Sequence, residues 1–144
     1  MKKFVTFFVI IFICGCNTQK NIKLEGAWQI VGWKHIVADT VAWEFPGTST
    51  GSDIIIWSKK HVLSVGRFKM DSTYNTNAVG GTYTLNGNKY EETLIYFPDS
   101  TQIGHKVTIL TEMSHDTLIR MYPVKENGQI DKSNYLIEHL VRLD

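Results

Sequence analysis

The fold is decided by residues 79–94, which read VGGTYTLNGNKYEETL. Two runs rich in strand-forming residues flank Asn86-Gly87, and Asn-Gly between such runs favours a hairpin with a two-residue type I′ turn. A turn of that type opposes Leu85 with Asn88, and the two-residue period of a strand then places alternate residues on the same face. The stretch therefore predicts an antiparallel hairpin with one aromatic face and one polar face.

The aromatic face of this hairpin should turn toward a protein interior. The turn predicts three cross-strand pairs on that face: Tyr83 with Tyr90, Gly81 with Glu92, and Val79 with Leu94. Tyr96 continues the same row two residues beyond Leu94. The opposite face carries mainly threonine and charged side chains, which belong in water.

Glu92 is the unusual residue of the aromatic face. A carboxylate that points into a protein interior is costly unless it is paired, hydrogen-bonded or protonated. One interpretation is that Glu92 and the hydroxyls of Tyr83 and Tyr90 form a polar anchor for a bound molecule. The competing interpretation is a hydrogen-bond network that only specifies the structure. Acid/base chemistry by these groups is a third possibility, although such groups are more often structural.

A second hairpin is predicted where two strand-like runs meet at His115-Asp116. If these residues form a two-residue turn, Arg120 and Tyr122 point inward. A planar guanidinium suits carboxylates, so Arg120 can then pair with Glu92 or receive an anionic group of a ligand. A three-residue turn would instead place Arg120 in solvent.

Eight segments beyond the N-terminus are rich in β-branched and aromatic residues and are bounded by Gly, Asn, Asp, Ser or Pro. They span residues 26–37, 52–58, 61–70, 79–85, 88–97, 105–113, 117–124 and 134–142. Short strands joined by tight turns predict an all-β fold, an eight-stranded antiparallel up-and-down barrel, with a two-sheet sandwich as the competing arrangement. A barrel of eight strands is either filled by its own side chains or holds one small ligand.

The N-terminal residues predict export rather than a permanent membrane span. Two lysines precede an apolar run of about ten residues, which is too short to cross a bilayer as a helix. The sequence Ile13-Cys14-Gly15-Cys16 resembles the bacterial lipobox, which implies cleavage before Cys16 and lipid on its side chain. The competing interpretation is an ordinary signal peptide followed by an incidental cysteine.

The chain is expected to divide into three segments: a signal peptide over residues 1–15, a tether over 16–23 and one domain over 24–144. One acyl chain holds a membrane only marginally, but the several chains of a bacterial lipoprotein make a durable anchor. We therefore expect a protein of the cell envelope, held by lipid on Cys16 at the outer membrane of a Gram-negative bacterium.

Composition argues against several classes of function. Removal of Lys2 and Lys3 with the signal takes the net charge from +1 to −1, which leaves no basic excess for nucleic-acid binding. With Cys14 removed and Cys16 acylated, no thiol remains for a disulfide or a thiolate metal site. The five histidines are scattered along the sequence, and no phosphate-binding loop or hydrolase motif is present. We therefore expect no metal, no cofactor and no enzymatic activity.

The two ends of the predicted barrel resemble those of lipocalins and the wider calycin group. The triplet GAW at 26–28 opens the first strand, and VRL at 141–143 closes the last. In that family a tryptophan near the closed end packs beneath an arginine of the last strand. The resemblance implies that Trp28 and Arg142 play these roles, with a cation stacked over an indole.

The central hairpin carries a more specific resemblance. Residues 80–83 and 90–93, GGTY and YEET, are similar to the core of small lipocalin-like domains found in bacterial envelope lipoproteins. In lipocalins the first long loop covers the open mouth, which implies that residues 38–51 form a lid carrying Trp43 and Phe45. The competing interpretation of this loop is a hydrophobic plug that closes the core.

The sequence thus predicts a lipid-anchored, lipocalin-like barrel with a small hydrophobic molecule as its ligand. The predicted ligand-binding residues are Tyr83, Tyr90, Glu92, Leu94, Tyr96, Arg120 and Tyr122, with Trp43 and Phe45 at the mouth. The competing function is a non-enzymatic envelope interaction module, whose barrel is filled and whose loops bind a protein or cell-wall partner.

Overall fold

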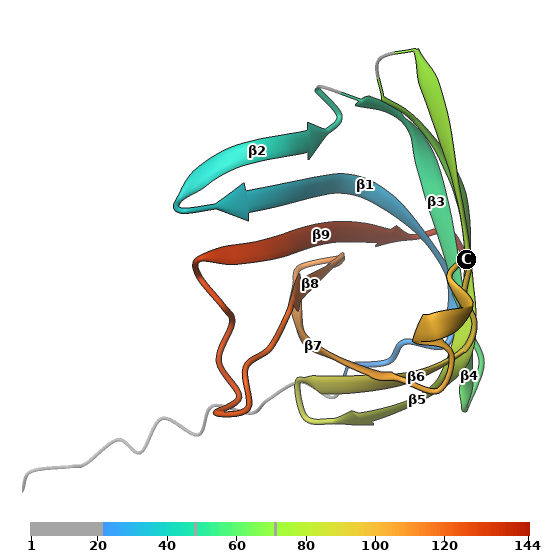
Figure 1. The fold of residues 1–144 in the computed structure, drawn as a ribbon. Coiled ribbons are helices and arrows are strands. Elements are labelled where there is room, and N and C mark those ends of the chain that lie inside the picture. Colours follow the sequence, from blue (N-terminus) through green and yellow to red (C-terminus); the bar gives the residue numbers. More distant parts are fainter. Residues whose placement is uncertain (1–21, 48, 71) are drawn as a thin grey trace, which may run out of the picture.

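The computed structural model describes residues 22–47, 49–70 and 72–144. The predicted signal peptide and Cys16 lie outside the described residues. The elements are β1 (Gly26–Val37), β2 (Thr40–Phe45), β3 (Ser49–Trp57), β4 (His61–Met70), β5 (Thr73–Asn86), β6 (Lys89–Tyr96), the 3₁₀ helix η1 (Ser100–Gln102), β7 (Lys106–Ser114), β8 (Thr117–Tyr122) and β9 (Asn134–Arg142) (Figure 1). Within those ranges of the chain, no helix is long and apolar enough to cross a membrane.

The strands form an antiparallel barrel that closes between its first and last strands. The order in the sheet is β2-β1-β3-β4-β5-β6-β7-β8-β9, and β1 also pairs with β9. This closing pair runs from Trp28 opposite Arg142 to Val37 opposite Asn134. The prediction of an all-β, eight-stranded antiparallel barrel is confirmed, with one strand added to it. The architecture is compatible with a lipocalin-like fold.

The added strand is β2, which takes the place of β3 along one edge of β1. Along one edge, β1 pairs with β3 over Gly26–Gln29 and then with β2 over Trp33–Val37. Figure 1 shows β2 lying beside β1 on the side away from the rest of the ring. The prediction of a long loop over residues 38–51 is therefore wrong. Ala38 and Asp39, with φ angles of 47° and 60°, form a tight turn that folds the chain back onto β1 as a hairpin.

The central hairpin keeps the predicted faces in a different register. Asn86 opposes Lys89, so Gly87 and Asn88 form the two-residue turn, and Tyr83 opposes Glu92 instead of Tyr90. The pairing is displaced by two residues, which leaves the inward and outward sets unchanged because side chains alternate with a period of two. The burial of Tyr90, Glu92 and Leu94 confirms the predicted inner face.

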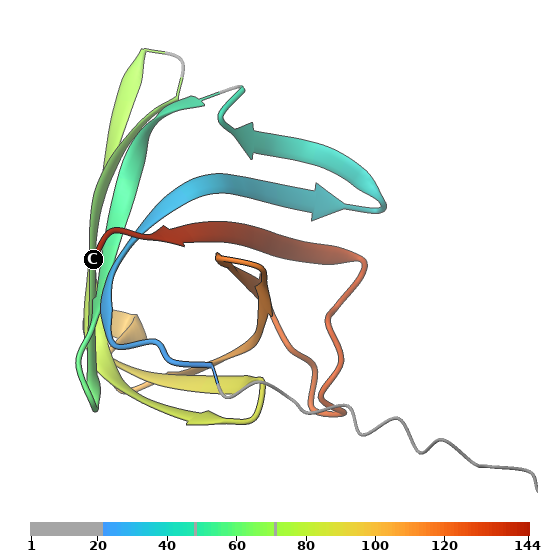
Figure 2. The same ribbon diagram turned by 180° about the vertical axis from the view of Figure 1, so that it is seen from behind.

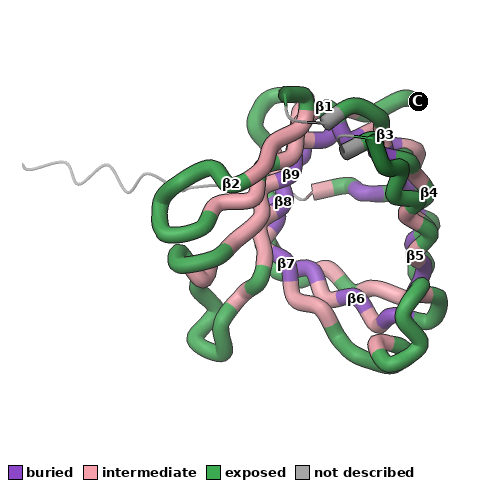
Figure 3. Tube along the Cα trace, turned by 45° about the horizontal axis from the view of Figure 1, so that its top comes forward, coloured by how far each residue is buried: buried purple, intermediate pink, exposed green. Residues whose placement is uncertain are grey.

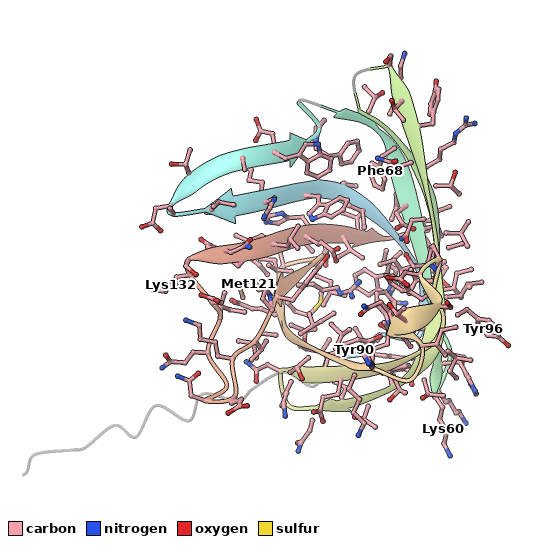
Figure 4. All side chains as sticks on the ribbon, in the orientation of Figure 1. Lys60, Phe68, Tyr90, Tyr96, Met121 and Lys132 are labelled. Atoms are coloured by element: carbon pink, nitrogen blue, oxygen red, sulfur yellow. The ribbon has the colours of Figure 1, made fainter. Side chains whose placement is uncertain are left out.

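Tyr96 departs from this face because β6 contains an irregularity. Gly81 opposes Leu94, whereas Gly80 opposes Tyr96, so two residues of β6 face one residue of β5. One extra residue reverses the alternation beyond it. The side chain of Tyr96 is 69% exposed and points away from the barrel (Figure 4). The prediction that Tyr96 continues the inner row is wrong.

The hairpin between β7 and β8 forms as expected. His115, with a φ of 55°, lies in a two-residue turn, and Thr111 opposes Arg120. This turn places Arg120 on the inner face, where it is buried. The strand β8 ends at Tyr122 because Pro123 has no N–H to donate to the sheet.

One end of the barrel is closed by Trp28 and the segment before β1. Trp28 is fully buried, and its Nε1 donates to the carbonyl of Leu24 at 2.8 Å. The guanidinium of Arg142 lies 4.5 Å from the centroid of the Trp28 ring and donates to the carbonyls of Lys23 and Glu25. Figure 2 shows this first segment, in blue, running across the barrel before β1 begins. The predicted stacking of Arg142 over Trp28 is confirmed.

Candidate functional site

The ring of strands, which Figure 3 shows from another side than Figure 1, surrounds a cavity of about 710 Å³. All nine strands contribute to its wall. The apolar part of the wall includes Ile30, Ile55, Val62, Leu94, Ile109 and Leu136. Cavities of this size, mostly apolar with a few polar groups, are typical of small-molecule sites.

Among the described residues, four carboxylate or guanidinium side chains are buried in the wall of this cavity. They are Asp53 on β3, Glu92 on β6, Arg120 on β8 and Glu138 on β9, each less than 10% exposed. Buried charges are costly unless they are paired, so each of the four needs a partner or a purpose.

Arg120 is paired with Glu138, which lies directly opposite it on the neighbouring strand. Arg120 Nη1 is 3.2 Å from Glu138 Oε2, and the Tyr122 hydroxyl donates to Glu138 Oε1 at 2.6 Å. Burial by itself lowers the pKa of Arg120, but the nearby carboxylate of Glu138 raises that pKa above its usual value. The proposed pairing of Arg120 with Glu92 is therefore wrong as a direct contact, because the β8–β9 register brings Glu138 to Arg120.

Glu92 ends a chain of hydrogen bonds from the closed end of the barrel. Trp57 Nε1 donates to the Tyr90 hydroxyl at 3.2 Å, and that hydroxyl donates to Glu92 Oε2 at 2.8 Å. Burial raises the pKa of Glu92, although Arg120 and the Tyr90 hydroxyl oppose this rise. Tyr83 stacks on Tyr90 with ring centroids 5.3 Å apart. Tyr90 therefore holds Glu92 in place and Tyr83 packs on Tyr90, but neither tyrosine lines the cavity.

Asp53 is held on one side only. Its Oδ2 accepts hydrogen bonds from Ser64 Oγ at 2.9 Å and from Asn77 Nδ2, while Oδ1 is buried without a hydrogen-bond partner. Burial raises the pKa of Asp53, and the two hydrogen bonds oppose this rise. All three residues line the cavity, so Asp53 is a fixed, buried carboxyl group in its wall.

An aromatic cluster fills the space where β1 separates from β3 and pairs with β2 instead. Trp33 lies 4.6 Å from Trp43 and 5.5 Å from Phe68, and Phe45 lies 5.3 Å from Phe68, with all distances between ring centroids. Trp33, Trp43 and Phe68 line the cavity. The indole N–H groups of Trp33 and Trp43 are buried and have no hydrogen-bond partner among the described residues. The strand β2 thus supplies a wall to the cavity in place of the expected loop.

The structure brings five of the nine predicted ligand-binding residues to the cavity. These are Glu92, Leu94, Arg120, Tyr122 and Trp43. Tyr83, Tyr90, Tyr96 and Phe45 are not part of its wall. Sequence reasoning missed Asp53 and Glu138, although each shares its inward parity with a buried neighbour on the same strand, Trp57 and Leu140 respectively.

In the described part of the chain, no group of three or more His, Cys, Asp or Glu side chains is arranged to hold a metal ion. The sequence matches no protein-family model, and a search of curated proteins finds no relative. Evidence about function therefore comes from the cavity and from the sequence.

We expect Asp53→Asn and Glu92→Gln each to raise the free energy of unfolding at neutral pH by about 1–2 kcal/mol. Burial raises the pKa of both carboxyl groups, so ionisation of either group destabilises the folded state. Each protonated carboxyl group makes its full contribution to the free energy of unfolding below the ordinary carboxyl pKa of about 4. This contribution is lost as the pH rises through the raised pKa. The amides avoid that loss. Urea unfolding at neutral and acidic pH measures the difference.

The matched control is Glu112→Gln, because Glu112 is an exposed glutamate on the outer face of β7. We expect this substitution to change the free energy of unfolding by less than about 0.5 kcal/mol at either pH. A loss of stability at neutral pH in both buried variants would show that the protein compensates the two ionised carboxylates fully.

Proposed function

We propose that this protein is an envelope binding protein that holds a small, largely apolar molecule inside its barrel. The observation that carries the proposal is the cavity of about 710 Å³. Its apolar lining suits the body of such a ligand, and the few buried polar groups suit a fixed orientation. The size lies within the range of pockets that take small molecules.

The N-terminal sequence supports the location of this function. A signal peptide over residues 1–15 and a lipobox ending at Cys16 would place the barrel at a membrane surface, held by lipid on that cysteine. We propose the cell envelope, at the outer membrane of a Gram-negative bacterium. The barrel would then act as a tethered receptor or carrier.

The proposal is of a binding protein rather than an enzyme. The hydroxyls of Tyr83, Tyr90 and Tyr122 all donate to internal partners, so they act as structural donors. Glu138 is engaged by Arg120 and Tyr122. These contacts support a site built to hold a molecule in place.

A second candidate function is an interaction module, favoured by an apolar stripe on the outside of the barrel. Ile54 opposes Val65 and Ile56 opposes Leu63 across β3 and β4, and all four side chains are at least 40% exposed. Contiguous exposed apolar residues are typical of partner-binding surfaces. The cavity nevertheless argues against the filled barrel that this alternative assumes, so we favour the first proposal.

The proposal is tested by filling the cavity. Val62 lines the cavity and Val65 faces outward on the same strand, so Val62→Phe and Val65→Phe make a matched pair. We expect Val62→Phe to weaken binding of the neutral probe 6-phenylhexan-1-ol by at least about tenfold, which is 1.4 kcal/mol. Val65→Phe should leave the affinity unchanged. Titration calorimetry of the full-length protein in nanodiscs of zwitterionic lipid, with empty nanodiscs as the blank, measures both.

Urea unfolding of the same variants shows whether overpacking has disturbed the fold. If Val62→Phe is unfolded, Leu136→Phe introduces the same side chain from β9, where Leu136 also lines the cavity. Equal affinities in the folded inner and outer variants, or no binding to the wild-type protein, would contradict the proposal.

A further inference from the structure

The wall of the cavity carries more buried acid than buried base. The described part of the wall contains three buried carboxyl groups, Asp53, Glu92 and Glu138, and one buried cation, Arg120. Arg120 and Glu138 form an ion pair with each other. Asp53 and Glu92 therefore remain without an ion-pair partner among the described residues, and the barrel interior has an excess of negative charge when they ionise.

The two carboxyl groups without an ion-pair partner are held in position by neighbouring hydrogen-bond donors, which leave one oxygen of Asp53 without a partner. Ser64 and Asn77 fix one oxygen of Asp53, and its Oδ1 is buried in the wall of the cavity without a partner. Tyr90 donates to one oxygen of Glu92. A carboxylate oxygen that is buried, fixed and unpartnered is suited to a hydrogen-bond donor that arrives with a ligand.

Both carboxyl groups add negative charge to the wall of the cavity when they ionise. Asp53 and Glu92 each lie within electrostatic range of both Glu138 and Arg120. Burial raises the pKa of Asp53 and of Glu92, and the neighbouring hydrogen bonds and Arg120 offset only part of this rise. A cation placed beside them would favour their ionised forms.

The same arrangement disfavours an anionic ligand. The only buried guanidinium in the described wall is already engaged by Glu138, and a carboxylate approaching it would also approach Asp53 and Glu92. The aromatic faces of Trp33, Trp43 and Phe68 suit either the apolar body of a ligand or a cation.

We propose, resting on the proposed function above, that the ligand is an amphiphile whose protonated amine binds at Asp53 while its apolar body occupies the rest of the cavity. The amine donates to Asp53 Oδ1, and the Glu92 carboxylate adds negative charge to the wall of the same cavity. The Arg120–Glu138 pair remains intact and forms the neutral part of the polar wall. The protein is then selective for alkyl or arylalkyl amines over alcohols and acids of the same shape.

The test compares three probes that differ only in the polar end: 6-phenylhexylamine, 6-phenylhexan-1-ol and 6-phenylhexanoate. Titration calorimetry uses the full-length protein in nanodiscs of zwitterionic lipid, with empty nanodiscs as the blank. We expect the amine to bind at least about tenfold more tightly than the alcohol, and the acid to bind more weakly than the alcohol. In Asp53→Asn/Glu92→Gln, the ratio of the affinity for the amine to the affinity for the alcohol should fall to about one.

Glu112→Gln on the outer face of β7 is the matched control and should leave all three affinities unchanged. Equal affinities of the wild-type protein for amine and alcohol would overturn the inference and leave the proposed function standing. Tighter binding of 6-phenylhexanoate would overturn it in favour of an anion held by Arg120. If none of the three probes binds, the proposed function fails as well. Thermal unfolding of the double variant confirms that it is folded.

Discussion

Arg120→Met is expected to destabilise the protein by about 3–5 kcal/mol, because it leaves a buried carboxylate without its cation. Arg120 and Glu138 are both less than 10% exposed, and Nη1 lies 3.2 Å from Oε2. The guanidinium also lies 5.6 Å from the ring centroids of Trp57 and Tyr90, so methionine removes these contacts too. Urea unfolding at neutral pH measures the loss.

The double variant Arg120→Met/Glu138→Gln separates the unpaired charge from the lost packing. Because glutamine carries no charge and can still accept from the Tyr122 hydroxyl, we expect the double variant to recover more than half of the stability lost in the single variant. If Arg120→Met costs less than about 1 kcal/mol, the ion pair is not the buried contact that the structure shows.

Trp28→Ala is expected to cost about 3–5 kcal/mol, since it removes the largest fully buried side chain at the closed end. The ring packs edge-on against Trp57 with centroids 6.4 Å apart, and it supports the Arg142 guanidinium at 4.5 Å. Its Nε1 also holds Leu24 across the end of the barrel. The loss should therefore loosen both the last strand and the first segment.

Tyr96→Ala is the matched control for Trp28→Ala. Tyr96 is a large aromatic residue on the outer surface, so its removal should change the free energy of unfolding by less than about 0.5 kcal/mol. Similar losses of stability in the two variants would contradict the packing of Trp28 at the closed end, because an exposed tyrosine would then contribute as much to stability as a buried tryptophan. Urea unfolding of both variants decides this.

The inner face of the central hairpin could be predicted from the sequence, because an error of two residues in the register does not change the face on which a side chain lies. An Asn-Gly turn and a Gly-Asn turn each contain two residues, so the cross-strand pairs move by two and every side chain keeps its face. Glu92 and Leu94 were therefore placed correctly from local pattern alone. The inward position of Arg120 follows in the same way from the two-residue turn at His115-Asp116, whereas the sequence also allowed a three-residue turn.

Features that depend on distant parts of the chain could not be predicted in this way. The extra residue in β6 shows only in its pairing with Gly80 and Gly81, where a Cβ on Gly81 would lie 2.1 Å from the carbonyl oxygen of Thr93. The strand β2 forms because one edge of β1 is free after β3 departs. Glu138 meets Arg120 only through the β8–β9 register.

Asp53 is a different case, because the alternation of residues along its own strand already predicts that it points inward. Ile55 and Trp57 alternate with it toward the interior, so the period of two already placed a carboxylate inside. Its hydrogen-bond partners come from Ser64 on β4 and Asn77 on β5, which only the assembled sheet brings together. Its buried position could be predicted, but its role in the cavity could not.

Native mass spectrometry of the protein released from membranes of its natural host tests most directly whether the barrel holds a small molecule. We expect a complex with one non-covalent ligand per chain, which is released on denaturation and is depleted in Val62→Phe but retained in Val65→Phe. The binding function would be contradicted if the wild-type chain carried no such ligand and bound added small apolar molecules no more tightly than Val62→Phe does.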